Sequence, residues 1–500
     1  MNSARTSQTR RSFLLKAAGT AGAAAVGSPT FLNALDSAFS KSTPGSAGFA
    51  QLIEVDFAQK DPADSSLYGR YLNFNGKRDQ FTEQDFQLYQ KQFGRLKLVR
   101  IWGTSNIDYA VQVADEALMV PGGNLHHPIS GNPKQAFAAE RMHNAESFID
   151  LWGLVHGTVT EDECVTLAER YLGAIKAKYP FVTHIEPFNE LTAKALDLPP
   201  GMTVEEAYYK GFRVAYLAAK ELNRKNSYAK PILVGGPACM GSQYVHGYLK
   251  NFITCYANDP DPSKGLDFLS IHYYIDGESD RMMAFRRDTE EILSAYHLPA
   301  VPLIVSEVGW KEKGAKPYNG NPIDALRWAT GSLAHTYQIA EQNVTPMQWV
   351  YPRKEDRYSM VAPAIDAPAL LPRGNAFKLA QMLKKNHAKS SIAIDSTGNG
   401  IYSVATFDES GVAILLFNYD ATGESPKTVA MKLLHTDKLA EQTGRVTEYL
   451  LDQSHGNYFA DKDAWQMKPI DSGEKSLRAL EHKVVALKGN AAYMLLISFA

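Results

Sequence analysis

The chain has 500 residues, of which 45% are hydrophobic, 21% charged and 11% aromatic, and its formal net charge at pH 7 is −2. A charge so close to zero excludes the strongly basic surface typical of nucleic-acid-binding proteins, and the length exceeds that of one ordinary domain. The cysteines have no metal-ligand spacing and allow at most one disulfide. We therefore expect a large and a smaller domain, each stabilised by a hydrophobic core, with no nucleic-acid partner.

The N-terminal residues 1–48 predict an export signal and a linker. Residues 10–16 read RRSFLLK and precede the Ala/Gly-rich stretch 17–27. Paired arginines before a weakly apolar run resemble a twin-arginine signal, which would engage the twin-arginine export machinery. The run is too short for a membrane span, and the Ser/Pro/Gly-rich residues 37–48 predict a linker. We therefore expect a periplasmic or secreted protein.

Short apolar segments alternate with segments of helical period between residues 51 and 385. This alternation predicts a parallel sheet with helices outside it, and eight such units would close a (β/α)8 barrel. Residues 104–160 are the least regular part, and we place the third strand within them. The predicted strands are 51–56, 96–102, 147–154, 179–190, 231–237, 266–274, 301–310 and 346–351, and the predicted helices are 79–96, 161–178, 204–223, 245–256, 281–296, 323–341 and 375–385.

A different pattern begins near Ser390. Short strands with turn residues between them are predicted at 400–407, 412–418, 427–434, 446–451 and 491–499, and no long helical period remains. This pattern predicts an antiparallel β-sandwich packed against the barrel. The expected fold class is therefore α/β, a (β/α)8 TIM barrel with a C-terminal antiparallel β-sandwich domain. The expected parts are a signal peptide and linker at 1–48, the barrel at 49–388 and the sandwich at 389–500.

Two of the predicted barrel strands end in a carboxylate. The mostly apolar residues 179–185 lead to Asn189-Glu190, and the apolar residues 301–305 lead to Glu307. In a (β/α)8 barrel the C-terminal strand ends carry the chemistry, because the βα loops open that face to the substrate. Either glutamate alone could be a salt-bridged residue at a strand end. Two of them at two strand ends are the pattern that a barrel glycosidase would show.

The chemistry of such a pair sets demands on its neighbours. Cleavage of a glycosidic bond with retention needs two carboxyl groups about 5–5.5 Å apart, one protonated and one ionised, so their surroundings must separate their pKa values. The amide of Asn189, next to Glu190, could hydrogen-bond the sugar 2-hydroxyl, a contact that strengthens in the transition state. This chemistry requires no cofactor and no metal ion, and the sequence indicates neither.

Four further side chains are candidates for the same site. His272 and Tyr274 lie two positions apart and therefore point to the same side of their strand, and a tyrosine hydroxyl would keep a carboxylate ionised and aimed. Arg100 would add a positive charge, and Trp349 a flat apolar face for a sugar ring. Each has a structural alternative: a satisfied core histidine, an ion pair or simple barrel packing. Glu186, in phase with Glu190, is interpreted as structural.

Together these motifs resemble the superfamily of retaining (β/α)8 glycoside hydrolases. The similar positions are Asn189-Glu190 on the fourth strand, His272-x-Tyr274 on the sixth and Glu307 on the seventh. The resemblance implies that Glu190 is the general acid/base and Glu307 the nucleophile. It implies supporting or substrate-contacting roles for Asn189, His272, Tyr274, Arg100 and Trp349.

Within that superfamily the chain most resembles glycoside hydrolase family 39, the β-xylosidase and α-L-iduronidase group. Residues 451–458 (LDQSHGNY), followed by Trp465, are similar to an Asp-x-x-His-x-Asn…Trp stretch in the accessory domain of that family. The chain departs from the family at Phe188 and Leu191, where members often have tryptophan and proline. Residues 104–160 match no part of the family pattern, so the substrate class stays open.

Two other classes of function are compatible with part of the sequence. A catalytically silent carbohydrate-binding protein could use the same scaffold, although the presence of both glutamates disfavours it. A redox protein with a cofactor would suit twin-arginine export, but the sequence has no cysteine cluster, haem motif or GxGxxG fingerprint. The leading prediction is a retaining glycoside hydrolase that acts on an oligo- or polysaccharide.

Overall fold

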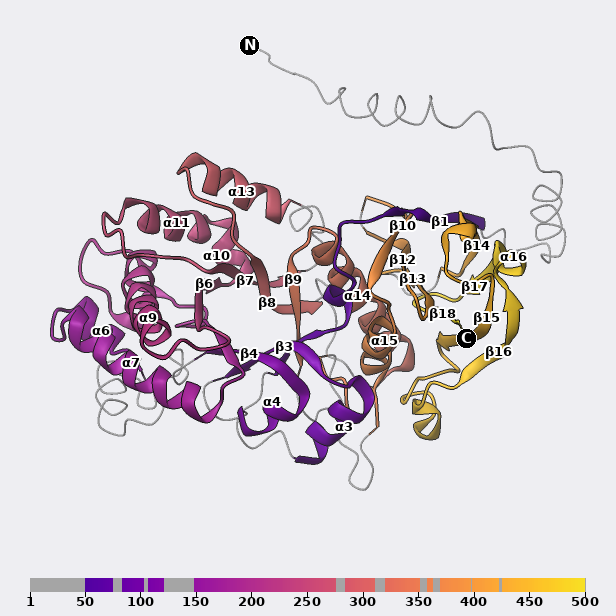
Figure 1. Ribbon diagram of the computed structural model, residues 1–500, viewed down its shortest axis with the longest axis horizontal. Coiled ribbons are helices and arrows are strands. Elements are labelled where there is room, and N and C mark those ends of the chain that lie inside the picture. Colours follow the sequence, from indigo (N-terminus) through magenta and orange to yellow (C-terminus); the bar gives the residue numbers. More distant parts are fainter. Residues whose placement is uncertain are drawn as a thin grey trace, which may run out of the picture. The chain divides into compact units, whose positions relative to one another are not determined.

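A computed structural model gives the fold of the chain (Figure 1). It describes residues 50–74, 83–102, 107–120, 148–275, 284–310, 320–350, 358–362, 369–396, 398–421 and 425–499. The predicted export signal and linker, residues 1–48, lie outside these residues. Within the described part of the chain, no helix has the length and apolar character needed to cross a membrane.

Eight parallel strands close into a barrel, in which the last strand pairs with the first. The strands are β2 (Tyr71–Phe74), β3 (Leu96–Trp102), β4 (Ala114–Val120), β5 (Val182–Ile185), β6 (Leu233–Cys239), β7 (Phe268–Ile275), β8 (Leu303–Trp310) and β9 (Thr345–Val350). The predicted (β/α)8 barrel is therefore confirmed.

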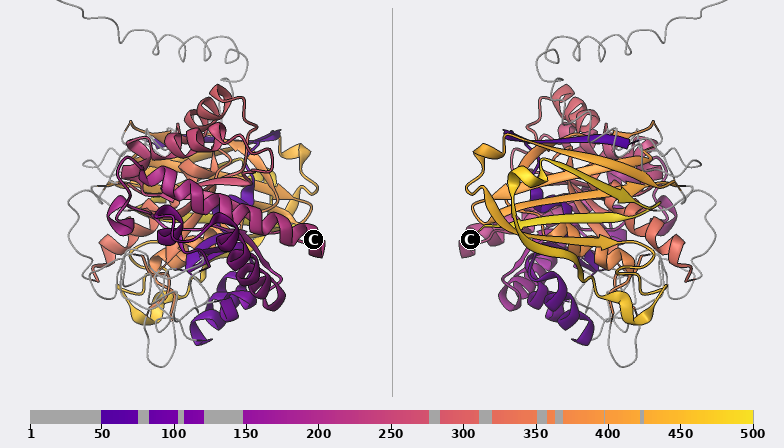
Figure 2. Two further views of the ribbon diagram at one scale, coloured as in Figure 1. Left: turned by 90° about the vertical axis from the view of Figure 1, so that its left-hand side faces the viewer. Right: turned by 90° about the vertical axis from the view of Figure 1, so that its right-hand side faces the viewer.

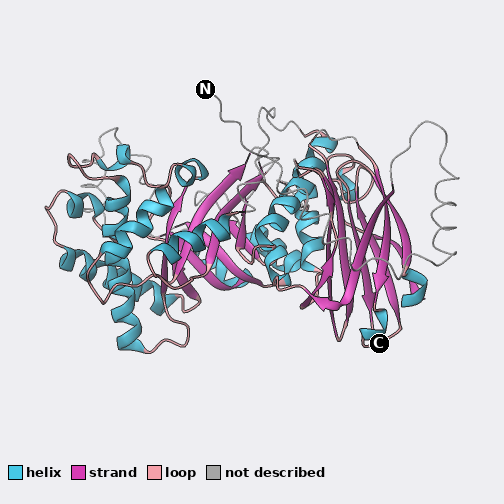
Figure 3. Cartoon of the chain, turned by 90° about the horizontal axis from the view of Figure 1, so that it is seen from above, coloured by secondary structure: helices cyan, strands magenta, loops and turns pink. Residues whose placement is uncertain are grey.

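Helices follow the strands and cover the barrel (Figures 1 and 3). Helices α7 and α9 each begin with a capping box. The Thr160 and Thr203 side chains accept hydrogen bonds from the main-chain amides of Glu163 and Glu206, and the side chains of these glutamates accept from the amides of the two threonines. The helices are α3 (Glu83–Phe93), α4 (Ile107–Val113), α6 (Leu151–Val155), α7 (Glu161–Lys178), α8 (Ala193–Leu196), α9 (Val204–Asn226), α10 (Gly241–Val245), α11 (Tyr248–Asn258), α13 (Phe285–Ala295), α14 (Pro322–Ala340) and α15 (Pro372–Gln381).

A ten-stranded sheet forms the rest of the fold, with the order β16-β15-β18-β13-β12-β10-β1-β14-β17 and β11 paired to β12. Figure 2 (right) looks onto its orange and yellow strands. Val412 and Ile414 of β13 share a core with Val429 and Met431 of β14, although these strands lie far apart in the strand order, so the sheet folds into two facing layers, as a sandwich requires. The strands are β1 (Ala50–Lys60), β10 (Asn386–Ser390), β11 (Ala393–Ile394), β12 (Gly400–Asp408), β13 (Gly411–Tyr419), β14 (Lys427–Leu434), β15 (Thr443–Leu451), β16 (Pro469–Ser476), β17 (His482–Leu487) and β18 (Ala492–Ser498), with helix α16 at Leu477–Leu480.

Two strand assignments from the sequence are corrected. Residues 51–56, counted as the first of the alternating series, belong to β1, which pairs antiparallel with β10 in the sheet. The first barrel strand is β2, whose four residues are all buried and show no alternation. The third barrel strand is β4, not residues 147–154, because Asp150 accepts from the Gly153 amide and starts helix α6 there. Strand β4 reads ADEALMV, a composition that favours helix, so tertiary pairing overrides propensity.

The sheet packs on the barrel through helix α14. Leu415 and Phe417 of β13 lie in one core with Trp328 and Tyr337 of the helix. Near the end of α14, Glu341 accepts from the Tyr68 hydroxyl, and burial raises the pKa of Glu341 from 4.5 to about 7, with Asp61 adding to the effect and Tyr68 opposing it.

We expect Glu341→Gln to stabilise the protein at pH 8 and to change its stability much less at pH 4.5. The raised pKa means that the folded state keeps a proton that the unfolded chain releases, so stability falls as the pH rises from 4.5 to about 7. The shift corresponds to about 3 kcal/mol at most, and glutamine avoids this loss because it does not ionise.

Urea unfolding of both proteins at the two pH values measures this difference. Burial lowers the pKa of His387, which lies 4.0 Å from Glu341, so the histidine contributes stability that rises with pH. Because His387 contacts Glu341, both proteins are compared in a His387→Gln background, in which this histidine does not titrate. An equal effect of the substitution at pH 4.5 and pH 8 would show that Glu341 is ionised in the folded state throughout.

Candidate active site

The inner face of strand β7 presents polar side chains to the barrel interior. Ile271 and Tyr273 belong to the core outside the barrel, so the alternation of a strand turns His272 and Tyr274 inward. His272 is fully buried and Tyr274 half-buried. The prediction that these two side chains share one face is confirmed.

A β-bulge in strand β8 turns Glu307 into the barrel. Val305 pairs with Ile271 and Glu307 with His272, so β8 carries one extra residue, Ser306, relative to β7. Residues opposite each other in a sheet face the same side, so Glu307 shares the inward side of His272. Val305 and Val308 both lie in the core outside the barrel. Bulges are common next to active sites because they redirect a side chain in this way.

Arg100 of strand β3 lies at the centre of the site, fully buried. Its Nε donates to Glu186 Oε2, its Nη1 to Glu307 Oε1 and its Nη2 to Asn189 Oδ1, each at 2.7 Å. Burial alone would lower the pKa of Arg100, but the charges of Glu186 and Glu307 outweigh it and the pKa is raised. The guanidinium therefore stays charged and joins three strand ends in fixed geometry.

Glu186 is the buried counter-charge of this arginine. It has no exposed surface. Burial would raise its pKa, but the positive charge of Arg100, with a smaller contribution from His272, outweighs burial and the pKa is lowered. Glu186 therefore faces the barrel interior as an anion that anchors Arg100, in agreement with its structural interpretation.

Glu190 is positioned by its own main chain. It has φ 47°, in the left-handed region, and its amide donates to the carbonyl of Ala238 at 3.1 Å. Ala238, with φ 48°, is itself the extra residue of a bulge in strand β6. Non-glycine residues held in this conformation cost about 1–3 kcal/mol and cluster at active sites. This strained segment follows strand β5 and places the Glu190 carboxylate against His272 of strand β7.

The two strand-end glutamates meet at His272. The Nδ1 atom of His272 lies 2.8 Å from Glu190 Oε1 and 3.6 Å from Glu307 Oε2. The Tyr274 hydroxyl donates to Glu307 Oε2 at 2.6 Å; burial and the negative charge of Glu307 raise the pKa of Tyr274 well above its usual value, so the hydroxyl keeps its proton. The Glu190 side chain is 24% exposed and that of Glu307 6%, so Glu190 is the more accessible of the two.

Trp349 of strand β9 stands beside these groups. Its ring centroid lies 5.6 Å from that of Tyr274 and 4.8 Å from that of Tyr358, both in edge-to-face contact. Trp349 is only 9% exposed, so it contributes mainly by packing against Tyr274. The seven residues predicted from the sequence thus lie at or just beyond the ends of strands β3, β5, β7, β8 and β9: Arg100, Asn189, Glu190, His272, Tyr274, Glu307 and Trp349.

Comparison with solved structures identifies the fold. The chain is similar to a glycoside hydrolase family 39 enzyme from Xanthomonas axonopodis pv. citri (13% identity, 92% of this chain and 100% of that one, TM-score 0.57) and to a monomeric β-xylosidase from Caulobacter crescentus CB15 (12%, 90% and 100%, 0.55). It is also similar to the bacterial orthologue of human α-L-iduronidase (13%, 90% and 84%, 0.59). The chain has the fold of a (β/α)8 glycoside hydrolase. No family model and no curated protein matches the sequence.

This glycoside hydrolase fold also brings together residues that the sequence analysis did not select. Trp102 lies above Arg100, whose Cζ is 5.5 Å from the centre of its ring. Because Trp102 is two positions after Arg100 on the same strand, period-two alternation would have found it. Asn73 of β2 donates to the Ser306 carbonyl at 2.7 Å. Tyr358 is a turn residue beyond strand β9, and no local pattern marks it.

A single group among the described side chains has the arrangement of metal ligands: Glu190, His272 and Glu307 each place an atom within 4.8 Å of the others. The Arg100 guanidinium, 2.7 Å from Glu307, puts a fixed positive charge next to this position. Repulsion from that charge disfavours a cation here. The surroundings of Glu190 and Glu307 therefore suit a pair of catalytic carboxyl groups better than a metal site.

Proposed function

We propose that this protein is a retaining glycoside hydrolase in which Glu307 is the nucleophile and Glu190 the general acid/base. The observation that carries the proposal is the closeness of the two carboxylates, whose nearest oxygens lie within 4.8 Å. Retaining enzymes hold these groups about 5–5.5 Å apart, whereas inverting enzymes leave about 6.5–9.5 Å for a water molecule. The substrate is an oligo- or polysaccharide, and the fold shared with glycoside hydrolases supports this class.

The surroundings of the two glutamates differ in the sense that this mechanism needs. Glu307 accepts from the Arg100 guanidinium and from the Tyr274 hydroxyl, which hold a charged nucleophile in one orientation. Glu190 has a more exposed carboxyl, in contact with His272, and can therefore reach the leaving oxygen. Asn189, held by Arg100 at 2.7 Å, is placed to bind the hydroxyl next to the anomeric carbon.

The reaction then proceeds in two displacements. Glu307 attacks the anomeric carbon and forms a glycosyl ester, while Glu190 gives its proton to the departing oxygen of the aglycone. Glu190, now ionised, takes a proton from water, and the water oxygen displaces Glu307 from the sugar. The hydrolysed sugar keeps its anomeric configuration, and both carboxyls return to their starting states.

Trapping and product analysis test this proposal. Aryl xylosides, glucosides, galactosides and iduronides are screened first, and a 2-deoxy-2-fluoro derivative of the accepted sugar is then added. We expect one equivalent of sugar on Glu307 by mass spectrometry of peptides, and a first product of retained configuration by NMR. An inverted first product would exclude the retaining mechanism. Binding of sugars without turnover of glycosides or polysaccharides would favour the catalytically silent alternative.

We further propose export by the twin-arginine route, on the basis of residues 10–16. A reporter fused to residues 1–48 should reach the periplasm, and replacing the paired arginines by lysines should stop it. A reporter that still reaches the periplasm with the lysine pair would exclude this route.

A further inference from the structure

A buried guanidinium lies behind the aromatic side of the site. Arg373, in the first turn of helix α15, is 3% exposed. Its Nε donates to Ser332 Oγ at 3.0 Å and its Nη2 to Gln348 Oε1 at 2.6 Å. Its Nη1 donates to two main-chain carbonyls, that of Trp349 at 2.8 Å and that of Tyr358. One side chain thus ties helix α14, strand β9 and the segment at Tyr358 to helix α15.

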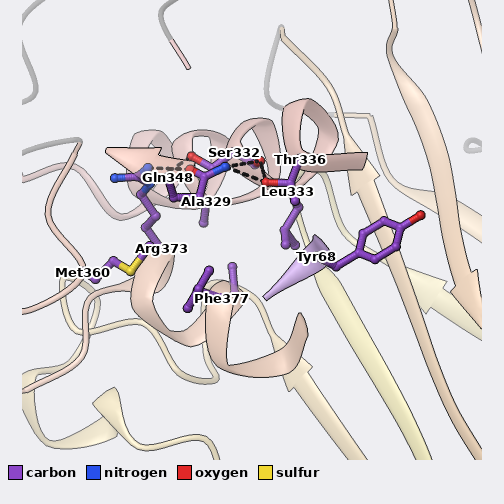
Figure 4. Close-up of a pocket in the computed structure, with 10 residues that line it drawn as sticks. Tyr68, Ala329, Ser332, Leu333, Thr336, Gln348, Met360, Arg373 and Phe377 are labelled. Atoms are coloured by element: carbon purple, nitrogen blue, oxygen red, sulfur yellow. Dashed lines mark hydrogen bonds between the residues drawn. The ribbon is translucent and has the colours of Figure 1, made fainter. Parts of the chain in front are cut away.

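The acceptors of this arginine are themselves held in place. Gln348 Nε2 donates to Thr336 Oγ1 at 2.5 Å, and Ser332 Oγ donates to the Trp328 carbonyl at 2.8 Å. Figure 4 shows Arg373 and Gln348 converging on the turn of α14 that carries Ser332 and Thr336. A guanidinium is planar and its donors point in fixed directions. The main chain at Trp349 and Tyr358 is therefore held in one position relative to α14.

The rings attached to that main chain contact the tyrosine that binds Glu307. The ring centroids of Tyr274 lie 5.6 Å from Trp349 and 6.1 Å from Tyr358, and both contacts are nearly perpendicular. The Tyr274 ring also lies directly against the main chain of Gly309, because a Cβ atom at that glycine would collide with the ring and would approach the Tyr358 ring to 3.0 Å. The Tyr274 ring is thus enclosed by Trp349, Tyr358 and the Gly309 main chain, and its hydroxyl points to Glu307.

We propose that Arg373 is a positioning residue for the nucleophile. It fixes the main chain of Trp349 and Tyr358, their rings fix the Tyr274 ring, and Tyr274 directs the carboxylate of Glu307. This inference rests on the proposed function for its kinetic consequence, but the placement of Tyr274 by Arg373 can be measured without a substrate. Lysine keeps the charge of Arg373 but lacks the planar fork that reaches four acceptors on three segments.

A double-mutant cycle tests whether Arg373 acts through Tyr274. The rate of labelling of Glu307 by the fluorinated glycoside is measured in the parent, Arg373→Lys, Tyr274→Phe and the double variant. In the parent we expect Arg373→Lys to slow labelling about tenfold and to change the KM for the accepted aryl glycoside less than about twofold. In the Tyr274→Phe background we expect Arg373→Lys to slow labelling less than about twofold. Equal slowing in both backgrounds would overturn the inference.

A second measurement needs no activity. With 3-fluorotyrosine at position 274, the fluorine NMR signal reports the surroundings of that ring. Arg373→Lys is expected to shift the signal, and an unchanged signal would overturn the inference. If Glu307 is not labelled in the parent, the proposed function fails while the NMR result still decides whether Arg373 positions Tyr274.

Two further variants separate positioning from general destabilisation. Thr330→Val removes a buried hydrogen bond from helix α14, in which Thr330 Oγ1 donates to Asn490 Oδ1 at 2.9 Å. It is expected to lower stability while leaving the labelling rate and the fluorine signal unchanged. Gln348→Leu removes one acceptor of Arg373 and is expected to act in the same direction as Arg373→Lys. It keeps the test available if Arg373→Lys does not fold. A fluorine shift in Thr330→Val equal to that in Arg373→Lys would contradict the inference.

Discussion

Glu307→Gly is expected to lower kcat at least about 10³-fold, a loss of about 4 kcal/mol of transition-state stabilisation. The reason is that the substitution removes the oxygen that would bond to the anomeric carbon, and water in its place has no fixed position next to Arg100 and Tyr274. Azide is expected to enter the vacated space and restore turnover. Because azide acts in a single displacement, its product should be a glycosyl azide of inverted configuration. Steady-state kinetics on the accepted aryl glycoside, with NMR of the azide product, measure both effects.

The control for this experiment is a half-buried glutamate of the same barrel, outside the site. Glu341 lies near the end of helix α14 against the sheet, and Glu341→Gln should keep the parental kcat. Near-parental turnover in Glu307→Gly would remove Glu307 from the mechanism. A glycosyl azide of inverted configuration from Glu190→Gly, together with one of retained configuration from Glu307→Gly, would mean that the two glutamates have exchanged roles.

Arg100→Met is expected to destabilise the fold by about 3–5 kcal/mol, because it leaves carboxylates buried without their partner. Glu186 has no exposed side-chain surface and Glu307 only 6%, so water cannot replace the guanidinium. In the parent the pKa of Glu186 is lowered, so its ion pair contributes stability above the ordinary carboxyl pKa. Without Arg100, burial raises that pKa instead, and the folded state must hold a proton. The deficit in urea unfolding should therefore grow as the pH rises.

Two variants show whether the loss arises from the buried charge. Adding Glu186→Gln to Arg100→Met should recover part of the stability, because the uncompensated charge is then gone. Arg213→Met removes an arginine that is 21% exposed, and its ion-pair partners Glu161, Asp259 and Asp261 are 37%, 11% and 27% exposed. It should cost less than Arg100→Met, because water reaches the charges that it leaves. Equal losses for Arg100→Met and Arg213→Met, or a deficit independent of pH, would contradict this reading of Arg100.

Elements whose signals are local could be predicted from the amino-acid sequence. Helix α7 was predicted with its observed bounds, Glu161–Lys178, because its cap and its apolar spacing lie within one segment. The inward pair His272 and Tyr274 follows from period-two alternation alone. Glu190 and Glu307 could be selected because a carboxylate at the end of an apolar strand is rare enough to be informative, and the parallel topology brings all such strand ends to one face.

The pairing of the strands and the direction of their last side chains depend on contacts between distant segments, which local patterns do not contain. The local pattern of residues 51–56 predicts a strand but does not say whether it belongs to the barrel or to the sheet. Its pairing with β10 places it in the sheet. Simple alternation along β8, with Ile304 opposite Ser270, would have turned Glu307 away from the barrel. The extra residue at Ser306 reverses that direction, and bulges depend on the register of two neighbouring strands. The hydrogen bonds of Arg100 and Arg373 likewise join segments far apart in the chain, and no local pattern encodes them.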